Sequence, residues 1–447
     1  MGNEFPEDSM NKTKGIENIF RSLKYKNFRL FFYGQSISLI GTWMQRIATP
    51  WLVYSLTDSV FLLGLVGFAG QIPTFLIAPF AGVLIDRWNR YTILLVTQIL
   101  AMIQALVLAY LFFDHSIQVW QIMLLSISLG CINAFDMPAR QSFIVDMIEK
   151  REDLSNAIAL NSSMVNSARL IGPSVAGVLI SLTGEGMCFL VNGLSYIFVI
   201  AFLLMMKISP RKIIRSDTRV LQGLKEGFLY TFGLLPIRYI ILLLALVSLM
   251  GMPYTVLMPV FAKTIIHGGS HTFGFLMGAS GIGALTAAIY MASRKSVLGL
   301  GRIIPLFAAL FGVGLIAFSQ SANFLLSMFL MLVIGGGMIM QMTSSNTILQ
   351  TIVDDDKRGR VMSFYTMAFM GTAPFGSLMA GYLASIIGAP NTLIIGGVSC
   401  ILGAILFARK LPEIKRTIRP VYIRLGIIPE VNKGIQTATE LTALQKG

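Results

Sequence analysis

Apolar stretches long enough to cross a bilayer recur along most of the chain, separated by short polar breaks. A membrane-spanning helix needs about 20 predominantly apolar residues. The first six stretches lie near residues 28–56, 60–85, 91–113, 118–138, 156–183 and 187–207. The second six lie near residues 237–262, 272–292, 303–319, 323–350, 361–387 and 391–409. The pattern predicts an all-α integral membrane protein with twelve transmembrane helices in two six-helix halves.

Polar segments divide and flank the two sets of apolar stretches. They predict a cytoplasmic N-terminal segment at 1–27, a six-helix bundle at 28–207, a cytoplasmic central loop at 208–236, a second bundle at 237–410 and a cytoplasmic tail at 411–447. In the central loop, apolar residues recur every four positions, at Val220, Leu224, Phe228 and Phe232. This spacing predicts an amphipathic helix on the cytoplasmic membrane surface.

Composition agrees with a chain that lies mostly in lipid. Hydrophobic residues make up 55% of the 447 positions and charged residues 13%, about half the charge that a soluble surface needs. The first 27 residues lack the short apolar run of a cleaved signal peptide. Cys131, Cys188 and Cys400 lie inside apolar stretches, which indicates packing residues and neither a disulfide framework nor a metal site. We expect no cofactor.

The net charge of +14 predicts the orientation in the membrane. With the N terminus in the cytoplasm, every basic residue falls in a cytoplasmic segment except Lys263, which lies outside, and Arg46 and Arg169, which lie within predicted helices. Loops rich in Lys and Arg are retained on the cytoplasmic side. The basic excess therefore predicts cytoplasmic N and C termini in a bacterial cytoplasmic membrane and does not indicate a nucleic-acid partner.

The same glycine spacings recur in the two halves. The fifth and eleventh predicted helices share one spacing at an offset of 204 residues, with Gly172, Gly177 and Gly184 matching Gly376, Gly381 and Gly388. The second and eighth share another at an offset of 211 residues, with Gly67 and Gly70 matching Gly278 and Gly281. Repeated halves are typical of transporters. Glycines let helix backbones approach closely in lipid, which serves static packing and a sliding contact during gating equally well.

A short polar loop follows the second predicted helix and reads Gly82-Val83-Leu84-Ile85-Asp86-Arg87-Trp88-Asn89-Arg90. It resembles the cytoplasmic signature loop of the major facilitator superfamily, with Asn89 where glycine is common. The resemblance implies a gating motif of Gly82, Asp86, Arg87 and Arg90, in which Asp86 faces the positive start of the eleventh helix. Basic residues are available there at Arg358 and Arg360. A turn that only sets topology is the alternative.

The fifth predicted helix contains Gly172, Pro173 and Gly177. This segment resembles the Gly-Pro motif of the superfamily's exporters, without the paired glycines that often end it. Longer stretches resemble the transmembrane secretion effector branch, which includes the enterobactin exporter and macrolide efflux proteins: Trp51–Tyr54, Asp136–Phe143, Asp153–Ala157, Asn161–Ser163 and Arg358–Ser363. The resemblance implies secondary active export of amphipathic small molecules, of the drug, macrolide or siderophore type, by alternating access.

Polar residues inside the predicted helices mark a candidate substrate pathway: Trp43, Gln45, Arg46, Gln71, Asn166, Arg169, Gln341 and Asn346. A charge at the bilayer centre costs about 2.5–3.5 kcal/mol on insertion scales. Arg46 and Arg169 therefore need a partner, which is an anionic substrate group, an acid or a helix carbonyl. Asp136 has two possible partners, Arg140 four residues on and Arg169. No acid lies near the centre of a predicted helix, which argues against a strongly cationic substrate and leaves proton coupling open.

Other functions fit the sequence less well. An importer or a lipid flippase of the same fold is the alternative within transport. A membrane-embedded transferase is the alternative from another class, but it needs catalytic acids or His at a membrane face, and the two longest cytoplasmic segments lack His and paired acids. A receptor needs a signalling domain, and we find none. We expect a monomeric transporter and not an enzyme, with a small molecule and the lipid bilayer as its partners.

Overall fold

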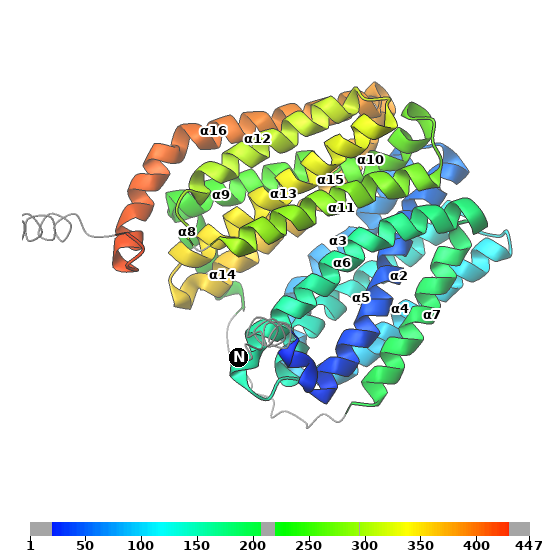
Figure 1. The fold of residues 1–447 in the computed structure, drawn as a ribbon, viewed down its shortest axis with the longest axis horizontal. Coiled ribbons are helices and arrows are strands. Elements are labelled where there is room, and N and C mark those ends of the chain that lie inside the picture. The colour runs from blue at the N-terminus through cyan, green and yellow to red at the C-terminus, as the bar shows by residue number, and fades with distance from the viewer. Residues whose placement is uncertain (1–19, 207–219, 295, 429–447) are drawn as a thin grey trace, which may run out of the picture.

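The computed structural model describes residues 20–206, 220–294 and 296–428. The first half begins with a 3-10 turn, η1 (Arg21–Lys24), and continues through long helices (Figure 1): α2 (Lys26–Thr57), α3 (Val60–Arg87), α4 (Arg90–Phe113), α5 (Val119–Asp146), α6 (Arg151–Thr183) and α7 (Glu185–Leu204). Five of these helices are long and apolar enough to cross a bilayer. The exception is the more polar α2, which at 32 residues is easily long enough and packs against α6 and α7.

The second half contains six further spans, two of which are interrupted by π-helical turns. One runs through α9 (Leu235–Leu246), η2 (Val247–Gly251), α10 (Tyr254–Val260) and η3 (Phe261–Ile265), and the other through α14 (Asp355–Thr366), η4 (Met367–Gly371) and α15 (Ala373–Ile387). The four continuous spans are α11 (Ser270–Ser293), α12 (Leu300–Ser319), α13 (Phe324–Ile352) and α16 (Ala389–Arg424). All six are long and apolar enough to cross a bilayer. The described residues contain no strand.

Several helices extend beyond the apolar stretches that predict them. The predicted ends at residues 138 and 409 lie well inside α5 and α16, which continue to Asp146 and Arg424. The predicted start of the fifth stretch, at residue 156, lies inside α6, which begins at Arg151. Apolar runs measure only the part of a helix within hydrocarbon, whereas the backbone hydrogen bonds continue into the polar layer.

The central helix α8 (Val220–Gly233) packs against α14. The Phe228 and Phe232 rings lie 6.1 and 6.2 Å from the Phe364 ring. A Cβ on Gly227 would lie 3.1 Å from Arg360 Cβ. The predicted stripe therefore contacts the bundle through these two phenylalanines, although Phe228 also keeps 51% of its surface exposed. The side chains of Val220 and Leu224 lie outside the described residues.

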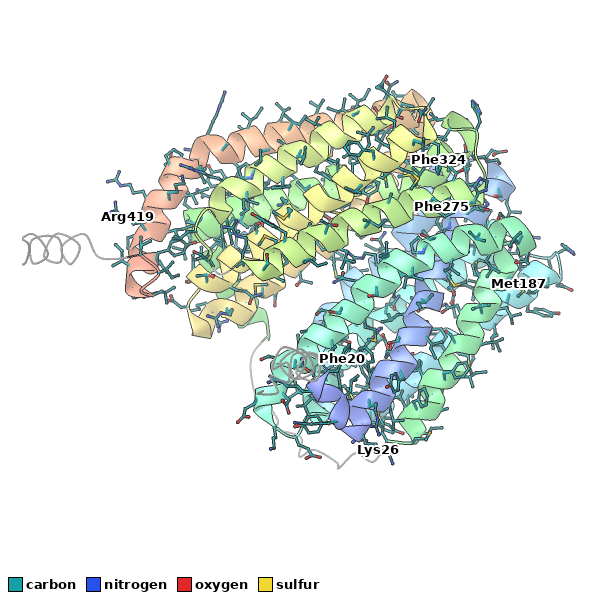
Figure 2. All side chains as sticks on the ribbon, viewed as in Figure 1. Phe20, Lys26, Met187, Phe275, Phe324 and Arg419 are labelled. Atoms are coloured by element: carbon teal, nitrogen blue, oxygen red, sulfur yellow. The ribbon has the colours of Figure 1, made fainter. Side chains whose placement is uncertain are left out.

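The two ends of the bundle differ in how closely the halves approach. We call the end where α2 begins and α16 ends the terminal face, and the opposite end the distal face. Lys26 and Arg419 lie toward the terminal face, and Met187 and Phe324 toward the distal face (Figure 2). The ribbons of the two halves meet at the distal face and diverge toward the terminal face (Figure 1).

Two helix crossings join the halves near the distal face, and each depends on a pair of glycines. At the crossing of α3 and α15, a Cβ on Gly64 would lie 2.7 Å from Gly381 Cα. At the crossing of α6 and α11, a Cβ on Gly177 would lie 2.9 Å from Gly274 Cα. Real Cβ atoms essentially never approach this closely. The crossings therefore require backbone contact, as small residues provide between helices in lipid.

Side chains reinforce this distal junction. Tyr54 and Thr264 share a hydrogen bond of 2.9 Å between their hydroxyls. Lys263 Nζ lies 2.7 Å from Asp58 Oδ1, and the Trp51 ring stacks on Phe273 at 5.9 Å. Tyr54 and Trp51 lie on α2, and Asp58 follows its end. Their partners Thr264, Phe273 and Lys263 belong to the second half. The described contacts between the halves thus run from the distal face to about the middle of the molecule.

We predict that Gly64→Ala destabilises this conformation by about 1–3 kcal/mol, because the added methyl overpacks the crossing. The matched control is Gly70→Ala on the same helix, where the added Cβ would meet its nearest neighbour at an ordinary 3.6 Å. Thermal unfolding of the purified protein measures the difference. Equal melting temperatures for the two variants would contradict the proposed tightness of the crossing.

Candidate functional site

The predicted gating loop forms the end of α3, the turn at Trp88 and Asn89, and the start of α4. Asn89 caps α4, because its side chain accepts a 3.0 Å hydrogen bond from Tyr91 N. Arg90 connects α4 to α5 through Asp146 Oδ2, at 3.3 Å, and Ser142 O, at 3.2 Å. The side chains of Gly82, Asp86 and Arg87 lie outside the described residues. Arg358 and Arg360 lie near the start of α14, and the gating role of this set stays a prediction.

The predicted Gly-Pro motif places α6 between two neighbours. Gly172 contacts Trp43 of α2 so closely that a Cβ has no room. Five residues on, Gly177 forms the crossing with Gly274 of α11, and α6 remains a continuous helix through Pro173. Gly172 therefore packs within the first half, whereas Gly177 packs at the junction between the halves.

Two of the predicted pathway glutamines are packing residues in this conformation. Gln45 is 3% exposed, donates to Gln104 Oε1 at 2.9 Å and accepts from Asn192 Nδ2 at 2.6 Å. Gln341 is 1% exposed and lies 3.4 Å from Ser345 Oγ within α13. Their amides form hydrogen bonds with buried polar groups of their own half, as buried amides usually do.

Two other amides of the predicted pathway have local or junction contacts. Gln71 donates to Gly67 O at 3.0 Å and to Ser377 Oγ of α15 at 3.3 Å, so it bridges the halves. Asn346 accepts from Gln350 one turn along α13 at 2.8 Å. Asn166 lies on α6, partly buried, one turn before Leu170.

Three of the predicted pathway residues form one cluster. The Cζ atom of Arg46 lies 4.7 Å from the centroid of the Trp43 ring, and that of Arg169 lies 5.2 Å from the same ring. Both distances are within the range of a cation–π contact. Tyr254 of the second half is near enough to act electrostatically on Arg169. The cluster therefore lies where α2, α6 and the second half meet.

The carboxylate of Asp136 is not a partner of Arg169. It forms an ion pair with Arg140 and accepts hydrogen bonds from Thr97 Oγ1 at 3.1 Å and Gln98 Nε2 at 2.7 Å. Arg140 also donates to Gln35 Oε1 at 3.3 Å. Of the two partners considered for Asp136, Arg140 is the one observed.

Asp136 is a buried acid near the end of the fourth apolar stretch. It is only 3% exposed, and α5 continues for ten more residues, to Asp146, roughly 15 Å of helix. Its burial therefore comes from neighbouring helices, and Arg140 compensates its charge.

Sequence reasoning also missed two acidic contacts at the terminal face. Asp153 at the start of α6 receives Arg21 Nε at 3.1 Å, Lys24 Nζ at 2.7 Å and the Tyr25 hydroxyl at 2.8 Å. The hydrogen bond to Asp153 raises the pKa of Lys24 above its ordinary value. In the second half, Asp354 receives Arg424 NH2 at 3.0 Å. Asp153 therefore connects the segment before α2 to the start of α6, and Asp354 connects the end of α16 to the start of α14. Both acids lie at the starts of the two spans that share a glycine spacing, and this placement was the available signal.

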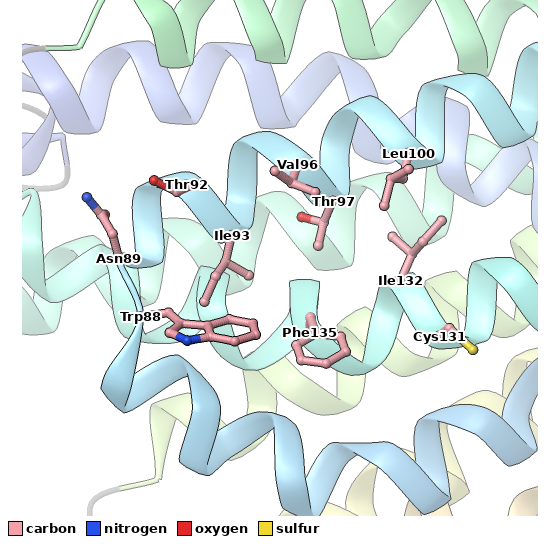
Figure 3. Close-up of a pocket in the computed structure, with 10 residues that line it drawn as sticks. All are labelled: Trp88, Asn89, Thr92, Ile93, Val96, Thr97, Leu100, Cys131, Ile132 and Phe135. Carbon is pink, nitrogen blue, oxygen red and sulfur yellow. The ribbon is translucent and has the colours of Figure 1, made fainter. Parts of the chain in front are cut away.

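A groove of about 710 Å³ lies elsewhere, between α4 and α5 (Figure 3). Its lining is nearly all apolar and includes Trp88, Val96, Leu100, Ile132 and Phe135. Trp88, Val96 and Leu100 are each about half exposed, and none of the lining residues is charged. The groove therefore fits the lipid-facing surface of the first half better than a polar substrate site.

Comparisons with known proteins agree with this architecture. The chain matches the family described as transmembrane secretion effector over residues 18–422. It is 26% identical to the staphyloferrin A transporter of Staphylococcus aureus over 380 residues, 85% of this chain and 95% of that protein. It is 22% identical to macrolide efflux protein A of Streptococcus pyogenes over 410 residues, 86% and 96% of the two chains. It is also 22% identical to the multidrug efflux pump Tap of Mycolicibacterium fortuitum over 370 residues, 79% and 88% of the two chains.

Solved structures share the fold at low sequence identity. One is a bacterial homolog of the human lysosomal transporter Spinster in an inward-facing, unoccupied conformation, with a TM-score of 0.65, 14% identity and coverage of 89% of this chain and 98% of that chain. Another is a bacterial homologue of the iron transporter ferroportin in an inward-facing state, with a TM-score of 0.65, 16% identity and coverage of 86% and 98%. The predicted fold of two six-helix halves is confirmed, and the chain belongs to the transmembrane secretion effector family of major facilitator superfamily transporters.

Proposed function

We propose that this transporter is a secondary active exporter that moves amphipathic small molecules out of the cell by alternating access. The observation that carries the proposal is the one-sided junction between its halves. The glycine crossings and the Asp58–Lys263 pair close the distal face, while the halves diverge toward the terminal face (Figure 1). Rocking about the Trp43, Arg46 and Arg169 cluster then exposes that cluster to each face in turn.

The orientation follows from the distribution of basic residues. We assign the terminal face, where α2 begins and α16 ends, to the cytoplasm of a bacterial cell, because Lys and Arg are retained there. The conformation is then inward-facing, and the distal face opens outward when the glycine crossings separate. Within this proposal, segment 1–27, the central loop 208–236 and the tail 411–447 are cytoplasmic and flank the bundles at 28–207 and 237–410.

Export and its energy source are further parts of the proposal. Two of the relatives are named as efflux proteins, and the Gly-Pro motif of α6 favours the same direction. We assign the driving force to the proton gradient, because Asp136 is a buried carboxylate in a spanning helix, and ionisable residues in such helices mark proton relays. The protein acts as a monomer and transports its substrate without chemical change.

We predict that inside-out membrane vesicles energised with NADH accumulate at least one member of a panel containing a catecholate siderophore, a macrolide and a neutral amphipathic dye. Collapse of the proton gradient with nigericin should abolish the accumulation. Asp86→Asn should lower the initial rate about tenfold, equivalent to about 1.4 kcal/mol, if the gating motif acts as proposed. The matched control is Glu413→Gln, an acid that pairs with Lys410 three residues earlier on α16.

Each outcome of the vesicle assay decides one part of the proposal. Accumulation that survives collapse of the proton gradient would remove proton coupling. Uptake into right-side-out vesicles only would indicate an importer. Wild-type rates in Asp86→Asn would remove the gating assignment and leave export intact.

We also predict that the distal ion pair biases the transporter toward the inward-facing state. The reporter is a cysteine at the buried junction position, Ser377→Cys, in a background without the natural cysteines. Lys263→Asp should increase the rate at which an external, membrane-impermeant maleimide labels this cysteine. An exposed pair contributes about 0.2–1 kcal/mol, so the increase should not exceed about fivefold. The swapped pair Asp58→Lys with Lys263→Asp should restore the original rate. A double variant that labels as fast as the single variant would show that the pair has no such role.

A further inference from the structure

We propose that the central cluster of Trp43, Arg46 and Arg169 is a binding site for organic anions that carry carboxylate groups. The transported cargo is of this class if the exporter proposal above holds, but binding itself does not depend on that proposal. The two guanidinium groups lie near one aromatic ring and have no acidic partner among the described residues. Arg46 is also exposed.

The geometry brings two like charges together over one aromatic ring. Because both Cζ atoms are measured from the Trp43 centroid, at 4.7 and 5.2 Å, they lie at most 9.9 Å apart, the sum of the two distances. A small organic anion with one or two carboxylates spans such a gap. The charge of Arg140, which is also near Arg46, is compensated by Asp136, so Arg46 and Arg169 are the uncompensated charges of this region.

No described acid neutralises either guanidinium. Neither Arg46 nor Arg169 has a carboxylate oxygen within 4 Å among the described residues, whereas Arg140 has Asp136. Arg169 Nε is buried and has no hydrogen-bond partner. A buried polar group without a partner is costly and uncommon in a native protein. An acceptor that arrives with the substrate would supply the missing hydrogen bond.

The position of the cluster excludes the ordinary structural roles of a membrane arginine. Arg46 lies eleven residues before the end of α2 at Thr57, roughly 16 Å of helix, and Arg169 lies fourteen residues before the end of α6 at Thr183. Arginines near helix ends extend to the headgroups, and these two are too deep for that role. Neither forms a hydrogen bond to a helix carbonyl within the described chain.

Arg46 is nonetheless accessible from outside the protein packing. Its side chain is exposed, so a ligand can reach its guanidinium group. Arg169 lies at the junction of the halves, because a Cβ on Gly281 of α11 would lie 3.4 Å from Arg169 O.

The chemistry of the three side chains favours a planar carboxylate. Guanidinium groups bind carboxylates through two parallel hydrogen bonds, and the Trp43 ring offers a flat surface for an apolar or aromatic part of the ligand. The same positive charges repel cations. The site therefore distinguishes an anion from a neutral or cationic molecule of similar shape.

The test is equilibrium binding to the protein in nanodiscs of neutral phosphatidylcholine, measured by isothermal titration calorimetry. The probes are benzoate, benzene-1,3-dicarboxylate and benzene-1,3,5-tricarboxylate, and the trimethyl ester of the last is the uncharged comparator. We expect the tricarboxylate to bind and the ester to bind at least tenfold more weakly. Arg46→Gln and Arg169→Gln should each raise the Kd of the tricarboxylate at least tenfold.

The matched control is Arg238→Gln, because Arg238 stacks on Tyr239 at 5.5 Å on α9, near the terminal face. It should leave the Kd within twofold. Arg46→Lys and Arg169→Lys serve where a Gln variant unfolds: they keep the charge but lose the two parallel hydrogen bonds, and we expect them to bind more weakly than wild type.

The proposal is overturned if none of the three carboxylates binds, if the ester binds as tightly as the tricarboxylate, or if both Arg sites can be changed without effect. Its failure is distinct from that of the exporter proposal. Nanodiscs that bind the tricarboxylate, combined with energised inside-out vesicles that do not accumulate it, would reject export of this class and keep the anion site.

Discussion

The close approach of glycine backbones at the distal face is the constraint on which the other features depend. Lipid is as apolar as leucine, so two helical halves gain little by burying apolar side chains against each other in a membrane. They are held instead by backbone packing, at Gly64 with Gly381 and at Gly177 with Gly274, and by a few polar contacts such as Asp58 with Lys263. Such a junction is tight in one arrangement and carries no large hydrophobic penalty when it opens. That balance is what alternating access requires.

The same physics explains where the charged residues lie. Inside the first half, the buried carboxylate of Asp136 is satisfied by Arg140, Thr97 and Gln98, because an unsatisfied group in hydrocarbon costs several kcal/mol. Arg46 and Arg169 break this rule at the junction between the halves. Exceptions of this kind are expected at functional sites, where the missing partner is the ligand.

The fold was predictable because its signal is long and redundant. Twelve apolar stretches and the position of Lys and Arg are read over hundreds of residues, so errors at single positions cancel. The burial of Asp136 among Thr97, Gln98 and Arg140 was not predictable, because hydropathy does not reveal which neighbours a helix face meets. Gln45 and Arg46 are adjacent in sequence, yet the first packs among Gln104 and Asn192 and the second is exposed. Rotation of the helix decides that difference, and it depends on neighbours that a single sequence does not reveal.

Helix α6 links the anion cluster to the distal junction. Trp43 packs on Gly172, Arg169 lies one turn before that contact, and Gly177 lies at the crossing with Gly274 five residues after it. The backbone of Arg169 is itself against Gly281 of α11, so an anion that draws the guanidinium toward Arg46 acts on the helix that must slide. If the proposed anion binds between Arg46 and Arg169, it offsets the repulsion between their two positive charges. Substrate binding then changes the free energy of the same helix contact that opens the distal face, because a ligand shifts an equilibrium only through its different affinity for the two states.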